Sequence, residues 1–165
     1  MIEKVIENVA RSEVFRTLVV LGSYRDEILK VIGNLPVSYC YNENYKNGML
    51  SSVQCGFSKL PERYDAAIVF PGDQPFIEPD VVNIMIDSYH KTGKGIVIPV
   101  YRKKRGHPLL VDFKYREFIE NLSDNDGLHN LAERFKDDVL EVETQSPGIL
   151  KDFDTKQDYL NEINK

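Results

Sequence analysis

Cysteine and long hydrophobic runs are both scarce in this sequence of 165 residues. The two cysteines, Cys40 and Cys55, are too few for a disulfide scaffold, and they form no Cys-x-x-Cys pair. Two cysteines are typical of a protein in a reducing cytoplasm, where each is expected to be a small buried side chain. So small a number also excludes a cysteine-rich metal site. No apolar run approaches the roughly 20 residues needed to cross a bilayer, and the start of the chain does not indicate a signal peptide. We therefore expect a cytoplasmic protein without a membrane partner.

Basic residues are outnumbered by acidic ones. The chain has 21 Lys and Arg against 26 Asp and Glu, which gives a net charge of −5. This balance argues against a general nucleic-acid or membrane-surface binder, although a local basic cluster can still hold an anionic small ligand. Hydrophobic residues make up 42% and charged residues 28%, as in ordinary soluble domains, and the length predicts a single domain over residues 1–165.

Segments with helical periodicity alternate along the chain with short runs rich in β-branched residues. Helices are expected at about 2–12, 26–32, 48–57, 79–90, 114–121 and 128–136, with a last one starting near Thr155. Strands are expected at 17–21, 37–41, 65–70, 96–100, 108–111 and 139–143. This alternation predicts an α/β domain with a mainly parallel sheet between helical layers. Ligands of such folds bind at the carboxyl ends of the strands.

The segment 70–75, Phe-Pro-Gly-Asp-Gln-Pro, directly follows a predicted buried strand. Its two prolines and its glycine favour a rigid turn around Asp73 at the expected ligand-binding edge. A carboxylate there can bind Mg²⁺ together with substrate phosphates. Asp73 could equally well cap the turn through its own backbone, and the spacing alone does not decide between the two.

Residues 72–75, Gly-Asp-Gln-Pro, resemble a motif of the molybdenum cofactor nucleotidyltransferases. Other segments agree with that family in the same order along residues ~1–160. The segment 48–53 is similar to its Gly-Met-x-x-Ser segment, 105–108 to its Gly-His-Pro motif, 124–127 to its Gly-Asp-x-Gly loop, and 152–158 to its Asp-Ile-Asp-Thr-Pro-Glu-Asp terminus. Each match is weak alone, but the ordered set is fairly specific and is most similar to the cytidylyltransferase branch.

This resemblance implies a three-layer αβα Rossmann-like nucleotidyltransferase sandwich. It implies Mg²⁺-dependent transfer of CMP or GMP from CTP or GTP to a molybdopterin-type acceptor, with release of pyrophosphate and with a molybdoenzyme as protein partner. By analogy, Asp73 and Asp154 would be catalytic and would bind the metal, with Asp152 as the alternative to Asp154. His107 and Arg105 would bind the acceptor.

Gly48, Ser51 and Ser52 form a second candidate site, at the start of a predicted helix. Free backbone N–H groups at a helix start, together with the helix dipole, can bind nucleotide phosphates. Plain capping by either serine or by Asn47 explains the same residues equally well.

A basic run, Arg102 to Arg105, can attract an anionic ligand in this acidic protein. A solvated hairpin loop is the simpler explanation for its two lysines, whereas Arg105 adjoins the Gly-His-Pro segment. His107 can donate a hydrogen bond to a phosphate or a pterin, or neighbouring backbone can satisfy it. His90 and His129 are expected at the surface.

One feature departs from the family, which opens with a strand and a glycine-rich nucleotide-binding loop. Nothing like that loop occurs here, and residues 1–10 already resemble the helix that follows it. We therefore expect a domain that is truncated at its N-terminus relative to the family, with an unfilled slot in the sheet. Such a chain should bind CTP and GTP no tighter than about millimolar, without turnover. Two other hypotheses stay open: a non-catalytic pterin- or nucleotide-binding module, and an enzyme that acts on another phosphate or sugar through Asp73.

Overall fold

The computed structural model describes residues 1–123, 127–153 and 158–160. Its α-helices are α1 (Ile2–Ala10), α2 (Arg25–Ile32), α3 (Met49–Lys59), α4 (Pro79–Thr92), α5 (Arg116–Glu120) and α6 (His129–Arg134). Its strands are β1 (Leu18–Leu21), β2 (Ser38–Tyr41), β3 (Ala66–Val69), β4 (Ile96–Tyr101), β5 (Lys104–Arg105), β6 (Leu109–Asp112) and β7 (Val139–Glu143). Each predicted element up to residue 143 is found within a few residues of its expected bounds, while Thr155 lies outside the described residues. No described helix combines the length and the apolar character that a membrane span needs.

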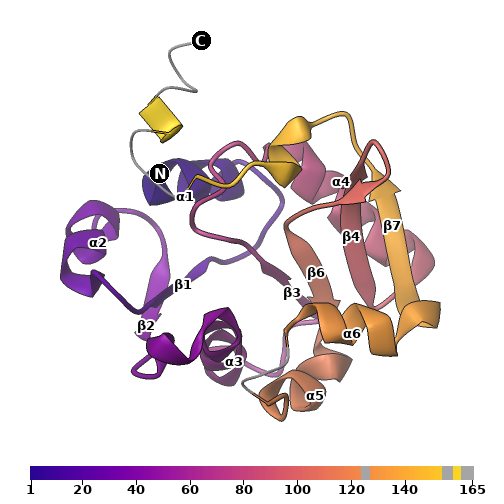
Figure 1. Cartoon of the computed structure of the whole chain (residues 1–165), viewed down its shortest axis with the longest axis horizontal. Helices are drawn as coiled ribbons and strands as arrows, with labels where there is room; N and C mark the ends of the chain where they lie inside the picture. Colours follow the sequence, from indigo (N-terminus) through magenta and orange to yellow (C-terminus); the bar gives the residue numbers. More distant parts are fainter. Residues whose placement is uncertain (124–126, 154–157, 161–165) are drawn as a thin grey trace.

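The strands form two separate sheets, which lie side by side in Figure 1. The smaller one pairs β1 with β2 in parallel. The larger one has the order β3-β6-β4-β5, and β7 pairs with β4.

The expectation of a mainly parallel sheet is not confirmed. Within the described residues β4 and β7 are parallel, but β6 runs antiparallel to both β3 and β4, and β5 runs antiparallel to β4. The physical reason is the short connection between β4 and β6. Residues 102–108 are too few for the crossover of a dozen or more residues that parallel neighbours need, so the chain turns back on itself.

Helices cover both faces of the larger sheet, and the alternation of side chains along β4 shows this directly. Ile96 and Ile98 pack into one hydrophobic cluster with Ile119 and Leu131 of α5 and α6. Val97, between them, packs into another cluster with residues of α4. Because neighbouring side chains of a strand point to opposite faces, the larger sheet lies between two helical layers.

A third hydrophobic cluster joins the smaller sheet to α1 and α2, through Leu21, Ile6 and Ile32. Between the two sheets lies a cavity of about 1300 Å³, lined by residues of α1, of β1 and of β3. No pairing joins β1 to β3 in the described part of the chain. The edges of two strands therefore border the same cavity.

Candidate functional site

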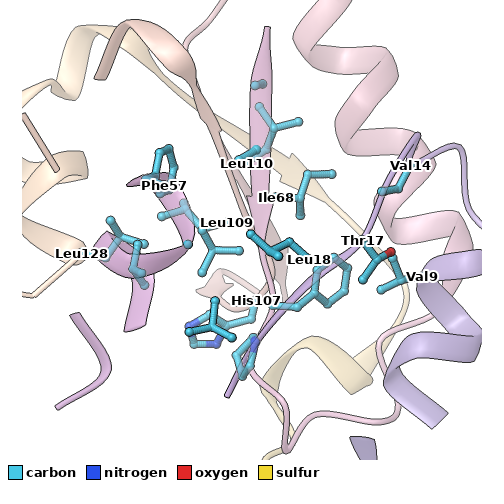
Figure 2. A pocket seen from close by; sticks show the side chains of 18 of the residues that line it. Val9, Val14, Thr17, Leu18, Phe57, Ile68, His107, Leu109, Leu110 and Leu128 are labelled. Atoms are coloured by element: carbon cyan, nitrogen blue, oxygen red, sulfur yellow. The ribbon is translucent and has the colours of Figure 1, made fainter. Parts of the chain in front are cut away.

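Most of the site residues that the sequence predicts line the cavity between the two sheets. Its lining includes Ser52 in the first turn of α3, the loop residues Gly72 and Asp73 after β3, and the segment 105–107 before β6. Figure 2 shows that the labelled side chains around it are mainly apolar and that His107 is the labelled titratable group. A polar edge is thus combined with an apolar interior, as is common in small-molecule sites.

His107 is held by the loop that carries Asp73. The side-chain amide nitrogen Nε2 of Gln74 lies 3.2 Å from Nδ1 of His107. In this arrangement the Gln74 amide donates to Nδ1, so Nε2–H of the imidazole can donate to a ligand. The backbone N–H of His107 donates to the carbonyl of Ile149 at 3.0 Å, which fixes the position of the residue. Gln74 itself is buried, and its Oε1 has no partner within the described residues.

Burial lowers the pKa of His107 below its ordinary value of 6.5, because the charged imidazolium loses hydration. The carboxylates of Asp73 and Asp152 oppose this effect and favour the protonated form. Both carboxylates therefore lie within electrostatic range of one imidazole, although they come from segments far apart in sequence. A neutral His107 is the form that accepts from Gln74.

The Asp73 loop is anchored from both sides. On one side Asn8 of α1 donates from Nδ2 to the carbonyls of Pro75 and Ile77, at 3.0 Å each. On the other side the backbone carbonyl of Asp73 accepts from the N–H of Phe153 at 3.1 Å. The half-buried Asp73 side chain is thus presented at the cavity by a rigid turn, while residue 152 follows at the neighbouring C-terminal segment.

Ser51 and Ser52 are tied to Asn42, which follows β2. Nδ2 of the buried Asn42 donates to both serine hydroxyls, at 2.9 and 3.0 Å. Oγ of Ser51 in turn lies 2.8 Å from the carbonyl oxygen of Gly48. Gly48 is the N-cap of α3 and has a φ of 97°, a conformation that favours glycine. The serine hydroxyls therefore brace the turn, and the backbone N–H groups of the helix start are what this segment offers to an anion.

Arg105 borders the cavity, but its guanidinium is engaged elsewhere. Its Nε donates to Oε1 of Glu141 on β7 at 2.6 Å, in an exposed ion pair. Arg102 and Lys103, both with positive φ, form the turn between β4 and β5, and Lys104 begins β5, so the two lysines lie in a hairpin as expected. His90 and His129 are exposed, as expected.

The carboxylates near His107 are the groups of this site that could hold a divalent cation. No group of three or more His, Cys, Asp or Glu side chains that could hold a metal occurs among the described residues. Asp73 and Asp152 both act on His107, and Mg²⁺ typically takes one or two carboxylates plus phosphate oxygens and waters. Asp73 and Asp152 are the described carboxylates near His107 that could take part in holding such an ion. Asp154 lies outside the described residues, so its role as a ligand stays a prediction.

Three residues with clear positions at the site were not assigned a role from sequence: Asn8, Asn42 and Gln74. Asn8 carried a usable signal, since it is a polar residue among the buried apolar positions of an amphipathic helix, beside Val5 and Val9. Asn42 and Gln74 lie in polar loops, where nothing in the local pattern distinguishes a buried amide from an exposed one. Their burial is decided only when distant segments meet.

Known proteins share both the sequence pattern and the fold. A sequence profile described as "MobA-like NTP transferase domain" matches residues 1–139. A protein of Natranaerobius thermophilus named "Probable molybdenum cofactor guanylyltransferase" is 29% identical over 106 residues, which cover 61% of this chain and 47% of that protein. The chain spans about half the length of the curated relatives it matches.

Two mycobacterial crystal structures have the same fold. The Rv0371c homologue of Mycobacterium sp. strain JC1 superposes with a TM-score of 0.82 at 20% identity, over 99% of this chain and 81% of the other. Rv0371c of Mycobacterium tuberculosis, solved as a complex with manganese, gives a TM-score of 0.78 at 19% identity, over 100% and 86%. The profile match covers well over half of the present sequence. This chain therefore belongs to the family of MobA-like NTP transferase domains.

Proposed function

We propose that this chain is a nucleotidyltransferase domain of molybdenum cofactor biosynthesis, which transfers GMP or CMP from GTP or CTP to a molybdopterin-type acceptor. The observation that carries the proposal is the meeting of three segments at one cavity: the Asp73 loop, the His107 segment and the start of α3. The motifs alone favour the cytidylyltransferase branch. Both curated relatives are named guanylyltransferases, which supports GTP as the donor.

The proposed reaction needs no covalent intermediate on the protein. An oxygen of the acceptor phosphate attacks the α-phosphorus of the nucleotide, and the bond to the leaving pyrophosphate breaks. Positioning and electrostatic stabilisation supply most of the acceleration in such chemistry. A bound Mg²⁺ would offset the charge that develops on the α-phosphate and on pyrophosphate.

We assign metal binding, nucleotide binding and acceptor binding to different segments of this chain. Asp73, with Asp152 or Asp154, would hold the divalent ion, and the turn around Asp73 is kept rigid by Asn8. The start of α3 would bind nucleotide phosphates through backbone N–H groups. His107, whose Nδ1 accepts from Gln74, would donate from Nε2 to the acceptor phosphate. The proposed reaction further implies a cytoplasmic location and a molybdoenzyme as the protein that receives the product.

The proposal is tested by measuring metal-dependent nucleotide binding to the full chain. Because the expected nucleotide affinity is weak, the method must detect binding in the millimolar range. Isotope-labelled protein is titrated with Mn²⁺ as a paramagnetic probe, with and without millimolar-range GTP or CTP, and amide signals near the cavity are followed. We expect GTP-dependent broadening around Asp73, His107 and Ser52 in the unmodified chain. The Asp73→Asn variant should lose this broadening and stay folded, since asparagine has nearly the shape of aspartate and the side chain is only half-buried; urea unfolding checks that it is folded.

Asp87→Asn is the matched control, because Asp87 lies on the exposed face of α4 and pairs there with Lys91 at 3.8 Å. It should bind Mn²⁺ and GTP like the unmodified chain. Equal broadening in the Asp73→Asn variant would remove Asp73 from the metal site. Binding of molybdopterin without any metal-dependent effect of GTP or CTP would instead identify a non-catalytic acceptor-binding module.

A further inference from the structure

The two cysteines face each other where α3 packs against the smaller sheet. Cys40 lies on β2 and Cys55 on α3, and their sulfur atoms are 3.8 Å apart. Both side chains are half-buried rather than fully buried, which differs from the expectation for inert structural cysteines. Cys55 also lies 3.4 Å from the carbonyl oxygen of Tyr41, which keeps its sulfur directed toward β2. The pair is therefore preformed in the reduced protein.

A bond between Cys40 and Cys55 would constrain the segment that shapes the start of α3 at the candidate site. The two cysteines are 15 residues apart and stand at the two ends of segment 41–54. That segment contains Asn42, Gly48, Ser51 and Ser52, which together shape the turn at the start of α3. A covalent bond between the sulfurs would close this segment into a loop and would fix α3 to β2.

We propose that Cys40 and Cys55 form a thiol–disulfide exchange site, which reacts with a low-molecular-weight disulfide of the glutathione type and reversibly closes segment 41–54. A disulfide needs its sulfurs at about 2.05 Å, so the two side chains must rotate toward each other. Sulfurs already in van der Waals contact and only partly covered can make that approach.

The environment of Cys40 indicates which of the two cysteines attacks the reagent first. Burial, followed by the neighbouring Cys55, raises the pKa of Cys40 to about 11, while Lys59 acts in the opposite direction. Because burial disfavours the thiolate of Cys40 and the thiolate is the nucleophile, we assign the first attack to Cys55. Its sulfur attacks one sulfur of glutathione disulfide, the S–S bond of the reagent breaks, and one glutathione thiolate leaves and takes up the proton that Cys55 lost.

The second step is internal. Once Cys55 is in a mixed disulfide it carries no negative charge, so one of the causes that raise the pKa of Cys40 is gone. The Cys40 thiolate attacks the sulfur of Cys55 and expels the second glutathione, which takes up the proton of Cys40. In total both protein thiols are oxidised to one disulfide, and one glutathione disulfide is reduced to two glutathione molecules.

The experiment treats the full chain with glutathione disulfide, quenches with iodoacetamide and measures the intact mass after denaturation. We expect the unmodified chain to lose both alkylatable thiols and the mass of two hydrogen atoms, with no retained glutathione, and dithiothreitol to restore both thiols. The Cys40→Ser variant should stop at a mixed disulfide on Cys55. The Cys55→Ser variant should form no intramolecular disulfide under the same conditions.

A structural readout keeps the proposal falsifiable if one variant folds poorly. Oxidation of the unmodified chain should slow amide hydrogen exchange in segment 41–54, and the same treatment of the double serine variant should not. Retention of both free thiols, a glutathione adduct that persists on the unmodified chain, or disulfide-linked dimers would each overturn the proposal.

Discussion

The side-chain amide of Gln74 and the imidazole of His107 meet at 3.2 Å, 33 residues apart in the chain. Gln74 follows β3 and His107 precedes β6, and these two strands are antiparallel neighbours. The pairing of the strands therefore brings the end of one next to the beginning of the other. One hydrogen bond links the loop that presents Asp73 to the residue proposed to hold the acceptor.

The first prediction concerns the pH dependence of stability. Burial lowers the pKa of His107 below 6.5, so the unfolded chain binds this proton more readily than the folded one. The contribution of His107 to stability should be complete above pH 6.5, and it should be lost progressively as the pH falls from 6.5 to the pKa of the folded state. Urea unfolding between about pH 7.5 and about pH 5 measures this dependence. The His107→Asn variant should show a smaller change, and an identical change in both proteins would contradict the prediction.

The second prediction separates acceptor from nucleotide. His107→Ala should weaken binding of molybdopterin by about 10- to 150-fold, since a hydrogen bond to a charged group is worth roughly 1.5–3 kcal/mol. GTP affinity should change little, because the phosphates of the nucleotide are proposed to bind at the start of α3. Calorimetric titrations with each ligand separately give the comparison. An equal loss for both ligands would show that His107 acts on the site as a structural residue.

The third prediction concerns the anchor of the Asp73 loop. Asn8→Ala removes two buried hydrogen bonds and leaves the carbonyls of Pro75 and Ile77 without this partner. Each such bond contributes about 1 kcal/mol, and unpaired buried carbonyls cost more, so unfolding free energy should fall by about 2–3 kcal/mol. Urea denaturation measures the loss. The exposed Asn34 is the matched control, and Asn34→Ala should stay within about 0.5 kcal/mol.

The fourth prediction tests whether the Arg105–Glu141 pair competes with the acceptor. If the guanidinium binds the acceptor phosphate, it must leave Glu141, to which it now donates at 2.6 Å. Arg105→Met should therefore weaken molybdopterin binding about tenfold or more, whereas Glu141→Gln should strengthen it by up to about fivefold. Both changes should alter stability by less than about 1 kcal/mol, because the pair is exposed. Unchanged affinity in both variants would make Arg105 a surface residue of the hairpin.

Local patterns in the sequence determined the secondary structure of this protein and the places where its site could lie. The spacing of apolar side chains in α1 and the β-branched runs of β1 and β4 are fixed by residues within a few positions of one another. Pro79, expected as the first residue of a helix, is indeed at the start of α4, because its fixed φ suits that position. Asp73 and His107 were likewise found from short segments, since glycine and proline around them mark rigid turns.

Tertiary structure alone decided which of these segments meet. The antiparallel course of β6 depends on the short connection after β4, and the pairing of β6 with β3 places Gln74 against His107. The pairing of β5 and β7 with β4 brings Arg105 beside Glu141. The contact between Cys40 and Cys55 depends on how α3 packs against β2, and the burial of Asn8 depends on the loop it anchors. Hydrogen bonds, ion pairs and the contacts that shift a pKa depend on residues a few ångströms away in space. The sequence pattern shows only which residues are neighbours along the chain. For this reason the candidate residues were visible in the sequence, but their partners and their charge states were not.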